Sequence, residues 1–229
     1  MASAPGVTLE FQRVSKSYPD SGTRFLLTID DLRIPAGAVV GLLGPSGSGK
    51  STFLNLAAGI DRPTSGRVLA DQTDLAALRE TDRARWRAAN AGFIFQGHLL
   101  PMGVPLREAV AMPLLWARNA LPRDARHKAD ALLERVGLAE SASQPAETLS
   151  GGQRQRAAVA RALIAEPRLL IADEPTGQLD AENARAIVDL VASWAREHGA
   201  TLIVVSHDEK SAPWPCTERF ELRDGKLAG

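Results

Sequence analysis

The run from Gly44 to Ser51 has the residue types and spacing of a phosphate-binding loop. Its residues are Gly44, Pro45, Ser46, Gly47, Ser48, Gly49, Lys50 and Ser51, which fit the pattern G-x-x-x-x-G-K-[ST]. Glycines let the backbone curl so that its N–H groups point inward at phosphate oxygens, and a following helix N-terminus adds partial positive charge. We therefore expect Lys50 to reach the β- and γ-phosphates of a nucleotide and the Ser51 hydroxyl to ligate Mg²⁺.

The flanking sequence predicts the strand and the helix that such a loop requires. The apolar run 38–43 before the loop is typical of a buried strand. The run 52–58 after it, which begins at Thr52, favours a helix. The alternative is a glycine-rich turn with a chance lysine, and the strand–loop–helix context disfavours it.

Two acids follow another predicted buried strand. Asp173 and Glu174 come directly after the apolar run 169–172. Asp173 could hold Mg²⁺ together with Ser51, because Mg²⁺ prefers hard oxygen ligands. Glu174 could orient or deprotonate a water that attacks the γ-phosphate. The alternative, two acids that simply end a strand at solvent, is weak beside a phosphate loop.

Two further polar residues follow other predicted strands. Gln96 ends the apolar run that starts at residue 92, and His207 closely follows the run 201–205. Because ligands of parallel sheets bind beyond the carboxyl ends of the strands, we expect these side chains to gather near the phosphate loop. Taken singly, each is more often a surface polar residue than a ligand.

The segment 149–156 predicts a second anion site. Ser150, Gly151, Gly152 and Gln153 stand at the start of a predicted helix over 150–164. A hydroxyl, exposed N–H groups and the helix dipole together favour an anion there. One nucleotide does not need two such sites from one chain, which suggests that this one serves a nucleotide held by another copy.

The order of elements predicts an α/β fold with a largely parallel sheet covered on both faces, since apolar strands alternate with helices. Two consecutive helices, 105–119 and 123–136, indicate a helical insert. We expect most of its apolar face to be core: Val104, Leu106, Val110, Met112, Leu114, Leu115 and Trp116. Neither a repeat nor a long linker marks a second domain, so residues 1–229 are predicted to form one domain, with a helical subdomain over about 97–165.

Composition narrows the class of protein. The chain has 229 residues, 45% hydrophobic and 24% charged, which is ordinary for a globular protein with a sizeable core. Lys plus Arg and Asp plus Glu number 27 each, so no net charge draws the chain to nucleic acid or anionic lipid. A single cysteine, Cys216, fits a reducing cytosol. We expect neither a secretory signal nor a transmembrane run of roughly 20 apolar residues.

In order and spacing, these motifs resemble the ATP-binding subunit of an ATP-binding cassette (ABC) transporter over about residues 7–227. The matching set is Tyr18, the phosphate loop 44–51, Gln96, the signature 149–153, residues 169–174, the run 177–180 ending at Asp180, and His207.

The resemblance implies ATP and Mg²⁺ as ligands and a role for each residue. Tyr18 stacks on adenine, Gln96 links the Mg²⁺ site to the transmembrane partner, Glu174 is the general base, and His207 contacts the γ-phosphate. Asp180 belongs to the nucleotide site. The family works as a head-to-tail dimer, in which the signature of one copy completes the ATP site of the other.

Residues 61–66, 111–115 and 222–225 are similar to the branch that includes lipoprotein-releasing and macrolide-export ATPases. The resemblance implies an integral membrane permease that docks near Gln96–Trp116 and holds the chain at the cytoplasmic face of the inner or plasma membrane. The exposed apolar residues Leu99, Leu100 and Met102 either form that docking groove or pack internally.

Two other classes of function stay open. One is a non-transport cassette protein that acts on ribosomes or DNA, and the other is a regulatory nucleotide switch. A single cassette and a balanced charge speak against nucleic acid, because its binding needs a basic footprint.

Overall fold

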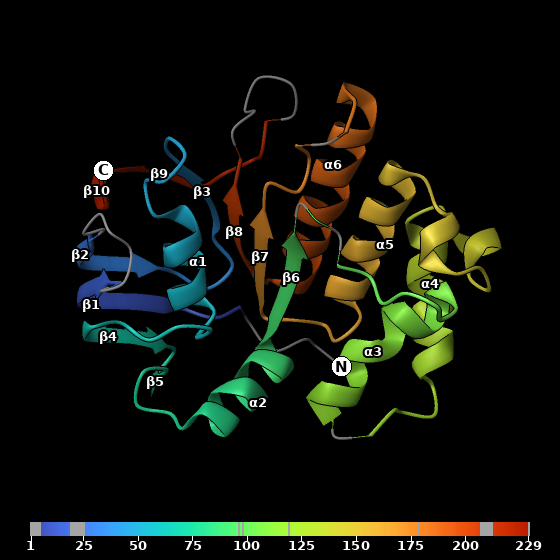
Figure 1. The fold of residues 1–229 in the computed structure, drawn as a ribbon, viewed down its shortest axis with the longest axis horizontal. Coiled ribbons are helices and arrows are strands. Elements are labelled where there is room, and N and C mark those ends of the chain that lie inside the picture. The colour runs from blue at the N-terminus through green and yellow to red at the C-terminus, as the bar shows by residue number, and fades with distance from the viewer. Residues whose placement is uncertain are drawn as a thin grey trace.

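The computed structural model describes residues 6–18, 26–95, 97, 99–118, 120–177, 179–206 and 213–228. A ten-stranded mixed sheet runs through them, with helices on both faces (Figure 1). The strands are β1 (Leu9–Ser17), β2 (Leu26–Ile34), β3 (Val39–Leu43), β4 (Ser65–Ala70), β5 (Thr73–Asp74), β6 (Ala91–Phe95), β7 (Leu169–Asp173), β8 (Thr201–Val205), β9 (Glu218–Arg223) and β10 (Lys226–Ala228). The helices are α1 (Lys50–Ala57), α2 (Glu80–Asn90), α3 (Leu106–Arg118), α4 (Ala125–Arg135), α5 (Gly151–Leu163) and α6 (Ala181–His198).

The strand order is β5-β4-β1-β2-β10-β9-β3-β8-β7-β6. From β9 to β6 every neighbouring pair is parallel, whereas β1 pairs antiparallel with both β2 and β4. This confirms the predicted α/β fold, with a largely parallel core and an antiparallel part beside it.

The central strands are buried on both faces, as their continuous apolar sequences predict. In β7, Leu169 and Ile171 pack into the core on the α1 side, whereas Leu170 and Ala172 pack against α5 and α6. Alternate residues of β8 divide in the same way. Because side chains alternate across a strand, one apolar run serves two cores.

A third core lies between α3, α4 and α5 and contains Leu106, Val110 and Leu114. Helix α5 belongs to this core through Ala157 and Ala160, and to the sheet core through other residues. The predicted helical insert is therefore packed on the sheet through a shared helix.

The expectation that α3 buries most of its apolar residues is correct for one face only. Leu115 is 44% exposed and Trp116 is 60% exposed. They extend the apolar surface of α3 beyond the face that packs on α4 and α5. The sequence could not predict this exposure, because periodicity shows that a residue is apolar but not which element covers it.

Two local expectations were wrong or incomplete. The sequence predicts an arginine-rich helix over 81–89 that Thr81 caps, but helix α2 starts at Glu80 after Arg79, so Thr81 lies inside it and does not cap it. Glu80 and Asp82 in the first turn favour this start through the helix dipole. Strand β5 was not predicted, because a two-residue strand carries no periodicity. Among the described residues, no helix is long and apolar enough to cross a membrane.

Candidate functional site

The phosphate loop connects β3 to α1, as the sequence predicts. Gly47 has φ +78° and Gly49, the N-cap of α1, has φ +108°, both in the left-handed region that favours glycine. A Cβ on Gly44 would lie 2.1 Å from the carbonyl oxygen of Leu222. These glycines are therefore required by the curl of the loop and by the close approach of β9.

The inside of the loop is suited to an anion. Lys50 is only 7% exposed, and its ammonium donates to the carbonyl oxygens of Gly44 at 2.7 Å and Pro45 at 2.8 Å. The Ser48 hydroxyl is buried and, within the described part of the chain, has no hydrogen-bond partner. A buried cation and an unsatisfied hydroxyl beside a helix N-terminus fit a phosphate group. Ser51 is exposed in the first turn of α1, where its hydroxyl is accessible to a metal ion.

Asp173 and Glu174 lie at the same edge of the sheet as this loop. Asp173 pairs in register with Val205 of β8, which in turn pairs with Leu42, two residues before the loop. Glu174 has φ +48°, a conformation that costs an ordinary residue on the order of 1–2 kcal/mol. A hydrogen bond of 2.9 Å from its N–H to the Val205 carbonyl holds it there. Gln96 and His207 lie outside the described residues.

The signature residues begin α5 through a capping box. The Ser150 hydroxyl accepts a hydrogen bond from the Gln153 N–H at 3.3 Å, and the Gln153 side chain accepts one from the Ser150 N–H at 2.8 Å. Gly151 is the first residue of the helix, and a Cβ on it would meet no described atom within 4 Å. The helix therefore starts at an open surface, as a second anion site requires.

A hollow of about 570 Å³ joins the signature to the start of α6. It is lined by Ser150, Gly152, Gln153, Arg156, Leu179, Asp180 and Asn183. Asp180 caps α6 by accepting a hydrogen bond of 2.9 Å from the Asn183 N–H, and this bond lowers the pKa of the carboxyl below its ordinary value. The predicted residues Ser150, Gly152, Gln153 and Asp180 thus meet in one place.

Three lining residues of this hollow, Arg156, Leu179 and Asn183, were not individually predicted as site residues, although Arg156 lies within the predicted segment 149–156. Arg156 donates to the side-chain oxygen of Asn183 at 3.1 Å and so connects α5 to α6. The available signal was spacing: Arg156 comes four residues after Gly152 and therefore shares its helix face.

The hollow and the phosphate loop are separate sites. No residue of the loop lines the hollow. Helix α1 packs on one face of the central strands, and α5 and α6 pack on the other (Figure 1). The two predicted anion sites of one chain are therefore in different surroundings.

Tyr18 lies beside the phosphate loop and is held by polar contacts. Its hydroxyl donates to the Asp61 carboxylate at 2.9 Å, and Asp61 also pairs with Lys16 at 2.8 Å. The Lys16 ammonium is 4.7 Å from the centre of the Tyr18 ring. Burial raises the pKa of the Tyr18 phenol above its ordinary value and the Asp61 carboxylate raises it further, whereas a hydrogen bond with Thr52 of α1 acts in the opposite direction.

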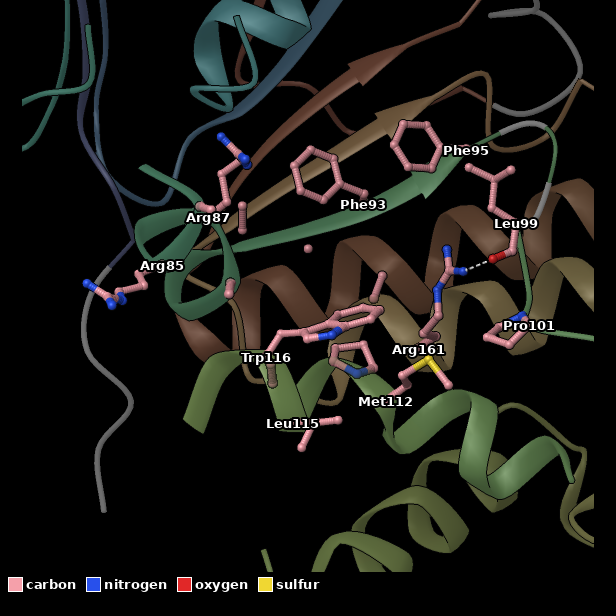
Figure 2. Close-up of a pocket in the computed structure, with 17 residues that line it drawn as sticks. Arg85, Arg87, Phe93, Phe95, Leu99, Pro101, Met112, Leu115, Trp116 and Arg161 are labelled. Carbon is pink, nitrogen blue, oxygen red and sulfur yellow. Dashed lines mark hydrogen bonds between the residues drawn. The ribbon is translucent and has the colours of Figure 1, made fainter. Parts of the chain in front are cut away.

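An apolar groove, here called the α2–α3 groove, opens between α2 and β6 on one side and α3 and α5 on the other (Figure 2). Its volume is about 750 Å³. Phe93 and Phe95 stack in it with ring centres 5.6 Å apart, and Trp116 faces them across the groove. Leu99, which is 64% exposed, also lines it.

The three residues proposed for docking or internal packing have different positions. Leu99 lines the α2–α3 groove, whereas Leu100 packs against the core of α3, α4 and α5. Met102 is 69% exposed and lies outside the groove lining. The sequence could not separate them, because all three are apolar residues of one irregular segment.

The phosphate loop at the carboxyl edge of a parallel sheet defines a nucleotide-binding protein of the phosphate-loop class. A family model described as "ABC transporter" matches residues 27–177, more than half of the chain. The chain belongs to the ABC transporter family. It is an ATP-binding subunit that hydrolyses ATP, and this hydrolysis is coupled to transport.

Individual relatives agree with this assignment. The lipoprotein-releasing system ATP-binding protein LolD 1 of Rhodopseudomonas palustris is 42% identical over 87% of this chain and 88% of its own length. The ABC transporter ATP-binding protein YtrE of Bacillus subtilis is 40% identical over 86% of this chain and 85% of its own length. A dimeric post-hydrolysis structure of the ATP-binding cassette MJ0796, bound to ADP and Pi, has a TM-score of 0.88 and 33% identity, covering 96% of this chain and 97% of its own.

Because Tyr18 is the only tyrosine of the chain, its ionisation can be followed directly by ultraviolet difference titration. We expect its pKa to exceed the ordinary value of about 10. The substitution Asp61→Asn should lower it, because it removes a negative charge that opposes phenolate formation. Asp189→Asn, an exposed change on α6, should leave the titration unaltered. Identical titrations of wild type and Asp61→Asn would contradict this account of the Tyr18 contacts.

Proposed function

We propose that this chain drives a membrane permease of the lipoprotein-release or efflux type by dimerising head to tail on ATP. The observation that carries the proposal is that the phosphate loop and the signature hollow, the two predicted anion sites, are separate in one chain. A single nucleotide bound to the loop leaves the hollow without a ligand. In a head-to-tail dimer, the nucleotide bound to the phosphate loop of each copy is the ligand for the signature hollow of the other copy.

The loop and the acids after β7 would perform the hydrolysis. Lys50 binds the β- and γ-phosphates, and Glu174 deprotonates or orients the attacking water. Ser51 and Asp173 would hold Mg²⁺, which neutralises charge on the phosphate oxygens when bound. Tyr18 stacks on adenine, and Gln96 and His207 keep the roles that the family resemblance implies.

Two observations support closure by a second copy. Gly151 faces open space, so no contact within the described part of the chain requires a glycine at that position. A backbone without a side chain permits a close approach of a partner or its nucleotide. The related cassette with ADP and Pi is itself described as dimeric.

The α2–α3 groove is proposed as the permease-docking surface. Part of its wall comes from the predicted region Gln96–Trp116, and the rest comes from α2, β6 and the end of α5. It exposes Leu99, Leu115 and Trp116. Exposed apolar grooves of this kind mark interaction sites. A permease seated there would hold the chain on the cytoplasmic face of its membrane.

The transported class is proposed from relatives. LolD 1 is a lipoprotein-releasing system protein, and the similarity extends over 87% of this chain. A cassette subunit contacts the permease and not the transported molecule, so the transported molecule depends on which permease the chain binds.

The test of transport is a pull-down of the full chain from detergent extract. We expect an integral membrane protein to be retained. Retention of ribosomal or soluble partners alone would favour the non-transport alternatives and contradict the proposal.

The substitution Glu174→Gln should bind ATP but lose steady-state hydrolysis by about 100-fold or more, because the amide cannot accept the proton of the attacking water. We also expect an ATP-bound dimer to accumulate, which size-exclusion chromatography with ATP would detect. Unchanged turnover would remove Glu174 from the role of general base.

The substitution Ser150→Arg should leave ATP binding to the monomer largely intact and abolish dimer-dependent hydrolysis, since the larger side chain fills the hollow. Calorimetry measures the binding and phosphate release measures the hydrolysis. Ser150→Ala is the matched control, because it removes the same helix cap without filling the hollow, and it should lose much less activity. Full hydrolysis by Ser150→Arg would argue against the head-to-tail dimer.

A further inference from the structure

The α2–α3 groove is apolar except for three arginines, and among the described residues only one of these arginines lacks an acidic partner. Arg85, on α2, pairs with Asp82 at 3.1 Å. Arg87, also on α2, pairs with Glu80 at 3.2 Å and donates to the carbonyl oxygen of Gly59. Each of these two guanidinium groups therefore has an acidic partner, although Asp82 also pairs with Arg79 and Glu80 also pairs with Arg83.

Arg161 comes from α5 and projects into the groove between Leu99 on one side and Met112 and Trp116 on the other (Figure 2). Its guanidinium donates one hydrogen bond, to the carbonyl oxygen of Leu99. In the part of the chain that the structure describes, no carboxylate lies within ion-pair distance of it. A guanidinium has five N–H donors, so most of its hydrogen-bonding capacity is unused by the protein.

The surroundings make this unpaired charge costly. Burial lowers the pKa of Arg161 from its ordinary value, in agreement with a side chain set among apolar groups. Filling the groove with an apolar segment would remove the remaining water and increase that cost. An occupant that carries an acid at the right place would instead supply the missing partner.

The position of the charge relative to the apolar wall also restricts the occupant. Phe93 and Phe95 lie on β6, and Trp116 lies on α3, so apolar surface flanks the guanidinium on both sides (Figure 2). The hydrogen bond to Leu99 connects α5 to the segment between β6 and α3 and fixes where the charge stands. A segment with apolar side chains and one acid matches this pattern better than a uniformly charged segment.

We propose that Arg161 forms an ion pair with an acidic residue on the otherwise apolar cytoplasmic segment of the permease that fills the α2–α3 groove. This inference rests on the proposed docking of a permease in that groove. The apolar walls supply most of the contact area, and the ion pair sets the register of the segment and excludes segments that lack an acid.

The test uses the full chain and the membrane protein that wild type retains in detergent extract, purified in micelles. Arg161→Gln keeps a donor for the Leu99 carbonyl and removes the charge, whereas Arg161→Lys keeps the charge. We expect Arg161→Gln to weaken permease binding about tenfold or more and Arg161→Lys to retain most of the affinity. Thermal unfolding verifies that each variant is folded.

The dependence of permease affinity on salt concentration is a second measurement. It would not differ between wild type and Arg161→Gln if Arg161 only packed against the permease. The affinity of wild type and of Arg161→Lys should fall as salt rises, and that of Arg161→Gln should depend on salt much less. Arg126→Gln on α4, outside the groove, is the matched control and should behave as wild type.

Three results would overturn the ion pair. The first is that Arg161→Gln and Arg161→Lys bind the permease with equal affinity. The second is that the affinity of wild type does not change with salt, and the third is that the affinity of Arg161→Gln depends on salt as strongly as that of wild type. Trp116→Asp separates this failure from failure of the docking proposal. Loss of binding in Trp116→Asp together with normal binding of Arg161→Gln keeps the groove and removes the ion pair, whereas normal binding of both variants removes the groove as well.

Discussion

The register of the central parallel strands determines where the chemistry of this protein can occur. Leu42 pairs with Val205, Val205 with Asp173, and Asp173 with Phe95, so four strands reach the same level at one edge. Backbone hydrogen bonds fix that alignment independently of the side chains that follow. The phosphate loop and the acids after β7 are close in space because of it, although more than a hundred positions separate Lys50 from Asp173 in the chain.

Helix α5 connects the other functional surfaces to that edge. Its first turn carries the signature, its middle packs on both the sheet and the α3–α4 core, and Arg161 near its end lines the α2–α3 groove. Gln155, buried on the same helix, donates to the carbonyl oxygen of Pro175 at 2.7 Å, one residue after Glu174. The helix therefore joins the hydrolytic edge, the signature hollow and the groove through direct packing and hydrogen bonds.

Prediction from sequence was most accurate where the signal is local. The phosphate loop at the start of α1 and the signature at the start of α5 each depend on residues within a few positions of one another. Prediction was less accurate where the answer depends on distant contacts. Thr81 did not cap α2, because the composition of the segment does not show at which residue the helix begins. Leu115 and Trp116 proved exposed, because periodicity does not show which surface packs on an apolar residue.

The sequence by itself determined the class of chemistry, because phosphate binding requires a fixed local pattern of glycines, a lysine and a serine that is written in consecutive positions. It also predicted a second anion site at the signature. Only the tertiary structure decided that the phosphate loop and the signature hollow are separate, that Arg156 and Asn183 line this hollow, and that Arg161 stands in an apolar groove where no described carboxylate pairs with it. Each of these depends on contacts between segments far apart in the chain, which residue order alone does not specify.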